Sequence, residues 1–285
     1  MSGLAFGLVL ASAFLHATWN LLAKRAAGGV GFLWLFSLVT VLVYLPVAVG
    51  YLWIVQPSVT SVHVAMALGS GVIHMGYFGF LQRGYRAGDL SLVYPLARGS
   101  GPALATALAI VLLGERPGAQ ALAGTALVVV SVFVLSGGGR LGDRRHRTAL
   151  GYGLLTGGFI AGYTVWDGYA VGTLGAVPLL FTVVADACRT LLLTPLALRR
   201  WHEVRATWQR HRLEALGVGV LSPFAYLLVL SALQYAPISL VAPTREVSIL
   251  IAAVLGSRLL AEGRTLQRGV AALAMVVGVA LLALS

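Results

Sequence analysis

Residues 16–20 of this chain read HATWN, and residues 163–167 read YTVWD. The Trp-Asn pair at 19–20 is therefore echoed by the Trp-Asp pair at 166–167, which lies 147 residues further along the chain. Two stretches of similar character at such a distance are the first sign that the chain consists of two related halves. The interpretation depends on whether other residues keep the same spacing.

Other pairs do keep that register through four predicted helices of each half. They are Arg98 with Arg245 and Glu115 with Glu262, both 147 apart, and Pro95 with Pro243, 148 apart. This pattern indicates gene duplication, with one residue lost between proline and arginine in the second copy. If each copy has an odd number of membrane spans, the second copy lies upside down relative to the first. That is the inverted-repeat architecture of many secondary transporters.

Composition predicts a membrane protein. Of 285 residues, 59% are hydrophobic and 10% charged, and the mean hydropathy is +0.90, which a soluble domain does not reach. Because about 20 apolar residues cross the hydrocarbon layer, ten segments fit end to end. They span roughly 3–23, 30–54, 60–82, 88–112, 118–138, 149–171, 176–197, 213–235, 237–260 and 266–284.

The predicted fold is therefore all-α, with ten transmembrane helices arranged as two inverted five-helix repeats. The predicted units are the first repeat at 1–138, a basic linker at 139–148 and the second repeat at 149–285. No room remains for a soluble catalytic domain. Because both halves are in one chain, a monomer suffices for a complete molecule.

The basic residues set the predicted orientation. A net charge of +11 would suit nucleic-acid binding, but the cations lie in short loops between apolar spans, so we exclude that function. One side carries Lys24, Arg25, Arg83, Arg86, Arg140, Arg144, Arg145, Arg147, Arg199, Arg200, Arg205, Arg210, Arg212, Arg258, Arg264 and Arg268, and the other carries Arg116 alone. The positive-inside rule predicts cytoplasmic basic loops and outside termini. The preference for Arg over Lys reflects GC-rich codons and favours a bacterial plasma membrane.

Cofactor chemistry has little support in the sequence. Cys188 is the only cysteine, so neither a disulfide within the chain nor a cysteine metal site is expected. His16 and His74 show no metal-binding spacing. We therefore expect no metal and no cofactor.

Several short motifs, occurring in order and partly twice, carry a family resemblance. They are His16-Ala17-Thr18-Trp19-Asn20 with Lys24 after it, Pro95 followed by Arg98, Leu113-Gly114-Glu115, and Gly124. The set resembles the EamA-like branch of the drug/metabolite transporter superfamily, and the resemblance covers the whole chain. It implies ten helices around a central cavity, no ATPase machinery, and export or exchange of small metabolites, often amino acids. The chain departs from the pattern at Ala271 and in the uncharged loop between the second and third spans.

Six charged residues lie well inside predicted spans rather than at their ends: Arg98, Arg189, Arg245, Asp167, Asp186 and Glu246. An arginine at mid-bilayer costs about 2.5 to 3.5 kcal/mol on insertion scales, so each must face protein or water. Asp186 and Arg189 share a helix face and are predicted to form a structural ion pair, with coupling or gating as the alternative.

Arg98 and Arg245 have the stronger case for substrate binding. Each follows a proline that frees a carbonyl one turn back, and such backbone is tolerated at membrane depth beside a wet cavity. A guanidinium there suits a substrate carboxylate, to which it donates two parallel hydrogen bonds. Structural pairing is the alternative for both.

Aromatic and polar residues recur near these charges. The predicted substrate-binding set adds Trp19, Asn20, His74, Tyr77, Tyr94, Tyr163, Trp166 and Tyr226. For the tryptophans, an interfacial belt or packing is an equal alternative. For His16 and His74, hydrogen bonding to a neighbouring helix competes with a coupling role.

The remaining carboxylates divide into structural and coupling candidates. Glu115 and Glu262 close their spans beside tight turns, where a carboxylate accepts hydrogen bonds from the first amides of the following helix. Glu246 corresponds to Gly99 in the first half, and this asymmetry suits proton coupling by a carboxylate that faces the cavity. Asp167, Asp186, Arg189 and His16 complete the coupling or gating set.

The sequence thus predicts a secondary transporter that works by alternating access between two inverted halves. Amino acids or related small metabolites are the expected substrates, outward is the expected direction, and proton exchange and passive exchange both fit. Two alternatives stay open, an intramembrane enzyme acting on a lipid or prenyl substrate and a channel-like accessory protein. The enzyme would need clustered polar groups, whereas the polar residues here are scattered singly over many helices.

Overall fold

The structure, a computed structural model, describes residues 1–26, 29–87, 90–135, 144–257 and 265–285, and it leaves out the side chains of several helical residues that border the gaps. Within those ranges the chain forms eleven helices and no strand. The helices are α1 (Gly3–Arg25), α2 (Val30–Val55), α3 (Ser61–Ala87), α4 (Leu90–Leu113), α5 (Ala119–Leu135), α6 (Arg144–Gly172), α7 (Pro178–Arg199), α8 (Trp201–Leu233), α9 (Ile238–Thr244), α10 (Val247–Ser257) and α11 (Thr265–Leu284). The prediction of an all-helical protein is confirmed.

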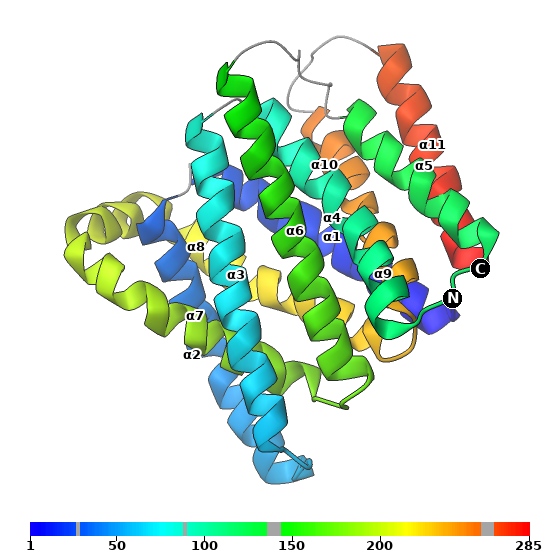
Figure 1. The fold of residues 1–285 in the computed structure, drawn as a ribbon. Coiled ribbons are helices and arrows are strands. Elements are labelled where there is room, and N and C mark those ends of the chain that lie inside the picture. Colours follow the sequence, from blue (N-terminus) through cyan, green and yellow to red (C-terminus); the bar gives the residue numbers. More distant parts are fainter. Residues whose placement is uncertain (27–28, 88–89, 136–143, 258–264) are drawn as a thin grey trace.

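Six of the described helices are long and apolar enough to cross a bilayer: α1, α2, α3, α4, α7 and α8. Two further apolar stretches, Ala119–Val134 of α5 and Gly269–Leu284 of α11, are shorter in the part of the chain that the structure describes. The links between α2 and α3 and between α6 and α7 lie at the lower end of the molecule in Figure 1. One end of each of the helices α3, α5, α6 and α11 lies toward the upper end.

The first departure from the predicted spans lies in the basic segment 199–212, where we expected a loop. Most of that segment is the beginning of α8, which bends at His211 (φ −132°, ψ 30°) and then continues as the predicted span. Val204 is buried in this part of α8. A Cβ added to Gly31 of α2 would approach the Val204 Cα at 3.2 Å. Close backbone packing on α2 therefore gives the basic segment its helical form.

The second departure divides the predicted span 237–260 into α9 and α10. Pro243 has no N–H to donate, and beyond it the backbone tightens, with the Glu246 N–H donating to the Pro243 carbonyl at 3.0 Å. Arg245 lies in the break. In the first half, α4 runs without interruption through Pro95.

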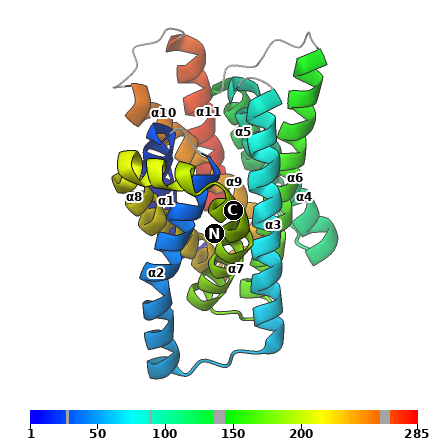
Figure 2. The ribbon, with the colours of Figure 1, turned by 90° about the vertical axis from the view of Figure 1, so that its left-hand side faces the viewer.

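Eight ring positions enclose the centre of the molecule. Each helix packs against the next in the order α1, α8, α2, α7, α3, α6, α4 and α9, and α9 together with α10 returns to α1. Neighbours in this ring come alternately from the two halves of the chain. Figure 2 shows one part of it, with α7 between α2 and α3.

Helices α5 and α11 form a pair outside the ring, side by side in Figure 1. Their backbones approach closely at two glycines. A Cβ added to Gly124 would lie 2.8 Å from the Gly278 carbonyl oxygen, and one added to Gly278 would lie 2.9 Å from that of Gly124. Small residues allow this approach, as they do between many membrane helices.

Candidate functional site

A central cavity lies inside the ring, with about 970 Å³ of atom-free space, part of it open to solvent. Seven elements line it: α1, α3, α4, α6, α7, α8 and the break between α9 and α10. Eleven of the residues predicted for the site line this one cavity: His16, Trp19, Asn20, His74, Tyr77, Arg98, Tyr163, Asp186, Arg189, Tyr226 and Arg245. Trp166, Asp167 and Glu246 do not line it, and the side chain of Tyr94 lies outside the described residues.

One end of the cavity is closed by the largest cluster of buried apolar residues. The cluster residues of α1 come before its cavity residues in the sequence, whereas most of those of α4, α6 and α8 come after the cavity residues of these helices. The cluster therefore lies at the end of the molecule where α4 joins α5, α6 joins α7 and α8 joins α9. Its members there include Ala5, Val9, Ala105, Ala109, Ala170, Val171, Leu230, Leu233, Val241 and Ala242.

Arg98 forms an ion pair that joins the two halves of the chain. Its Nε lies 3.1 Å from Glu246 Oε2, and its Nη2 donates to the Ser248 hydroxyl at 3.1 Å. Glu246 is 1% exposed and does not line the cavity, so the expectation that this carboxylate faces the cavity is wrong. The reason is that α4 packs against α9 and presents a guanidinium to Glu246, which lies with Arg245 in the break between α9 and α10.

Arg245 has a different environment although it is the counterpart of Arg98. Its Nη2 donates to the Tyr163 hydroxyl at 3.4 Å, and its Nε has no hydrogen-bond partner among the described residues. No carboxylate in the described ranges lies within ion-pair distance of it. Arg245 thus brings a cation to the cavity without an ion-pair partner from this part of the chain.

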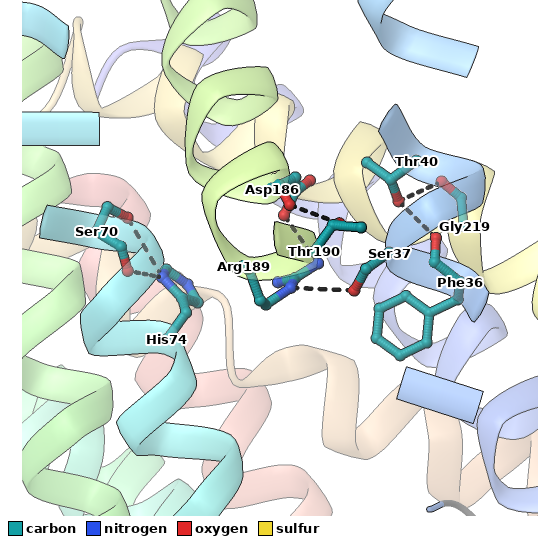
Figure 3. Close-up of polar contacts among 9 residues, drawn as sticks. All are labelled: Phe36, Ser37, Thr40, Ser70, His74, Asp186, Arg189, Thr190 and Gly219. Carbon is teal, nitrogen blue, oxygen red and sulfur yellow. Dashed lines mark hydrogen bonds and ion pairs between the residues drawn. The ribbon is translucent and has the colours of Figure 1, made fainter. Parts of the chain in front are cut away.

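Asp186 and Arg189 form the ion pair predicted from their spacing on α7, at 2.8 Å. Figure 3 shows the pair together with Ser37 of α2, whose hydroxyl accepts from the Arg189 Nε at 3.2 Å. The same guanidinium lies 5.6 Å from the ring centroids of Phe36 and Phe78. A planar cation stacked on two rings and held by a carboxylate is fixed in position.

Aromatic rings form one wall of the cavity. His74 stacks on Tyr163 with a centroid distance of 4.2 Å, and Tyr226 meets His74 edge-on at 5.7 Å. The His74 ring is held by Ser70 on the preceding turn, at 2.9 Å from the carbonyl and 3.3 Å from the hydroxyl (Figure 3). Tyr77 meets Tyr163 edge-on at 5.9 Å. This wall offers apolar faces beside polar edges.

The neighbouring residues Trp166 and Asp167 point to different places. Trp166 is 37% exposed and donates from Nε1 to the Met66 carbonyl at 2.8 Å, so it packs on α3 outside the cavity. Asp167 is fully buried behind Tyr226, whose hydroxyl donates to its Oδ2. Asn20, the counterpart of Asp167, donates to the His16 carbonyl at 2.8 Å.

Glu115 accepts two backbone hydrogen bonds, but from a helix other than the expected one. Its carboxylate oxygens accept from the N–H groups of Ile238 at 2.8 Å and Ser239 at 2.9 Å, the first residues of α9. We expected the following helix, α5, as the donor. The turn after α4 faces α9 at the closed end of the cavity, so the carboxylate caps a helix of the other half. Glu262 lies outside the described residues.

Small hydroxyl residues of the site escaped the sequence analysis. Ser37 and Ser248 hold arginines, and Ser12 lines the cavity while donating to the Ala225 carbonyl at 2.7 Å. Serine is common in membrane helices, so its presence carries no signal. These three serines differ from other serines only in the group that each hydroxyl contacts, and that contact is seen only in the structure. Among the described residues no group of three or more His, Cys, Asp or Glu side chains could hold a metal ion.

Comparisons with known proteins bear on the family and on the fold. The model of the EamA-like transporter family matches residues 147–284. No curated protein is similar enough in sequence to count as a match. One solved structure, described only as "Crystal structure of protein", is similar over 100% of this chain and 98% of that chain, with a TM-score of 0.79 and 16% identity. At that identity the likeness shows the fold alone.

Proposed function

This chain belongs, through residues 147–284, to the EamA-like transporter family of the drug/metabolite transporter superfamily, and on that premise we propose that it is a secondary transporter of small metabolites. The family and the apolar helices make it a multi-pass membrane protein. The substrates we propose are amino acids or related metabolites, moved outward across a bacterial plasma membrane. A single chain is the proposed working unit.

The packing of the helices supports the proposed ten-span inverted repeat. α1 packs on α8 as α6 packs on α3, and α2 meets its counterpart α7 as α5 meets α11. These are the contacts that a two-fold relation between 1–138 and 149–285 would produce, with 139–148 as the linker. In this arrangement α9 and α10 together form one span. With the basic loops in the cytoplasm, the closed end of the cavity faces outward.

The observation that carries the proposal is Arg245 in the wall of a cavity closed at one end. A buried cation without a carboxylate partner is costly to keep, and it becomes favourable when an anion binds it. A guanidinium can donate two parallel hydrogen bonds to a carboxylate. We therefore assign the main contact with the substrate carboxylate to Arg245, with Arg98, already held by Glu246, in a supporting role.

The aromatic wall supplies the rest of the proposed site. His74, Tyr77, Tyr163 and Tyr226 line the same cavity as Arg245, and so do Trp19 and Asn20 of α1. Such surfaces suit the apolar part of a small metabolite. Trp166 packs outside this cavity, so we leave it out of the proposed binding set.

The test is counterflow in proteoliposomes, with a panel of labelled amino acids, dicarboxylates, nucleosides and sugars. We expect saturable counterflow for members of the panel that carry a carboxylate. Arg245→Lys keeps the charge but loses the planar fork, so apparent affinity should fall by tenfold or more, or about 1.4 kcal/mol. Flux without saturation would favour a channel, and chemical change of a panel member would favour an enzyme. Normal transport by Arg245→Gln would remove this residue from the site.

A further inference from the structure

Asp167 is a buried carboxylate whose surroundings the binding site does not explain. It is fully buried on α6, its Oδ1 has no hydrogen-bond partner among the described residues, and no Arg or Lys of those residues forms an ion pair with it. The two other acids of the central region are paired, Asp186 with Arg189 and Glu246 with Arg98. A buried carboxyl without a counter-ion is least costly to keep in its neutral, protonated form.

The groups around Asp167 come from three neighbouring elements. They are the Tyr226 hydroxyl of α8, the Ser70 hydroxyl of α3 and the Arg245 guanidinium at the α9–α10 break, which lies beyond ion-pair distance. On α4 the charged side chain is Arg98, which is bound to Glu246. On α3, His74 is hydrogen-bonded to Ser70 and stacked on Tyr163. Asp167 therefore faces one cation at a distance and two hydroxyls.

Tyr226 is the connection between Asp167 and the cavity. Its hydroxyl donates to Asp167 Oδ2, and its side chain lines the cavity, whereas Asp167 does not. When the hydroxyl passes its proton to the carboxylate and takes another from a hydronium ion in the cavity, which becomes water, the phenol is unchanged and the carboxyl is neutral. A proton can thus reach Asp167 although the carboxylate itself touches no cavity water.

The duplication offers an internal comparison. Asn20 holds the position in the first half that Asp167 holds in the second, so an uncharged amide occupies the equivalent position of α1. Asn20 donates to the His16 carbonyl, whereas Asp167 accepts from the Tyr226 hydroxyl. The second half alone therefore has an ionisable group at this position, and such an asymmetry suits a role in the transport cycle.

We propose that Asp167 is the proton-binding site of this transporter, with Tyr226 as its relay to the cavity, and that a proton and an anionic substrate cross together. Ionised Asp167 and the substrate carboxylate are both attracted to the positive charge of Arg245. Protonation of Asp167 removes one of these two negative charges and so strengthens binding of the anionic substrate. The pair that crosses carries no net charge. For an acidic metabolite that accumulates in the cell, this couples export to release of a proton. The proposal rests on the proposed transport function.

The first experiment follows flux in proteoliposomes with the labelled acidic amino acid that gives the strongest counterflow, because such an amino acid is a net anion near neutral pH. Asp167→Asn should retain counterflow at equal pH and lose accumulation driven by an imposed acid-outside gradient. Glu203→Gln is the control, because it removes a carboxylate that is 45% exposed and does not line the cavity, and it should keep both activities. If Asp167→Asn still accumulates substrate under the gradient, or if Glu203→Gln loses that accumulation to the same extent, the proposal is wrong. Absence of counterflow in the unmodified protein would instead contradict the transport function itself.

A second measurement uses only the unmodified protein, so it does not depend on whether a variant folds. In proteoliposomes of the unmodified protein, uptake of the same amino acid without an imposed gradient should acidify the lumen, as read by a trapped pH-sensitive dye. Uptake without acidification overturns the proposal.

Infrared difference spectra between mildly alkaline and mildly acidic pH add a direct signature, because a protonated carboxyl band should appear in the unmodified protein and be lost in Asp167→Asn. An unchanged band in that variant also overturns it.

Discussion

At the scale of single residues, the Arg98–Glu246 pair is the clearest case in which charge holds the two halves together. Their side chains are 7% and 1% exposed. Breaking a buried pair leaves one charge without compensation and costs about 3–5 kcal/mol. We therefore expect Glu246→Gln to lower the free energy of unfolding by about that amount, measured by chemical denaturation in detergent.

The matched control for Glu246→Gln is Glu203→Gln. Glu203 pairs with Arg200 at 3.8 Å and both side chains are 45% exposed, so solvent screens the pair. Its loss should change stability by only about 0–1 kcal/mol. Equal losses in the two variants would show that the Arg98–Glu246 contact contributes little to the fold.

Which charges meet was only partly predictable from sequence. Asp186 and Arg189 are three residues apart, and helix geometry alone places them on one face. Arg98 and Glu246 are far apart in the chain, and their pairing depends on α4 and α9 becoming neighbours. Helix periodicity says which face a residue occupies but not which helix will lie opposite. For the same reason the carboxylate of Glu115 could be foreseen as a cap, but not the helix that it caps.

At the scale of elements, the contact between α5 and α11 depends on the absence of side chains at two positions. Gly124→Ala would place a methyl group 2.8 Å from a backbone oxygen of Gly278, which cannot move aside by a side-chain rotation. We expect a loss of about 1–3 kcal/mol in unfolding free energy. Gly158→Ala on α6 meets nothing within 4 Å and should be neutral or stabilising by up to about 1 kcal/mol. Similar thermal melting curves for both variants would contradict the close contact.

The cap that Glu115 forms on α9 should also be measurable. Glu115→Ala removes acceptors for two amides, and loss of a helix cap costs about 0.5–2 kcal/mol. Glu115→Gln keeps one acceptor oxygen and should lose about half as much. Denaturation in detergent compares the two. A larger loss in the glutamine variant than in the alanine variant would contradict capping as the role of this carboxylate.

The ends of helices were harder to predict than their presence. Hydropathy finds apolar runs, but α8 begins in a basic segment that becomes helical by packing on α2. Pro243 marked a weak point in the ninth predicted span, and the helix does break there. Pro95 marked the equivalent point in the first half, where α4 stays intact. A proline permits a break, and the surroundings decide whether it occurs.

At the scale of the whole molecule, the orientation in the membrane is a prediction that labelling can check. In a Cys188→Ser background, Arg145→Cys near the start of α6 should resist an impermeant thiol reagent in intact cells and react after lysis. Ser58→Cys lies between α2 and α3 at the opposite end and should react in intact cells. The reverse pattern would invert the topology and place the closed end of the cavity toward the cytoplasm.

The alternation of the two halves around the ring has a consequence for biosynthesis. A ribosome delivers helices in chain order, yet every ring neighbour of α1, α2, α3 and α4 belongs to the part of the chain that is made last. The early helices must therefore wait in the lipid with their polar faces uncovered until their neighbours are inserted between them. Assembly of this protein is consequently an interleaving of two sets of helices, and severing the gene between them would yield two fragments that can mature only in each other's presence.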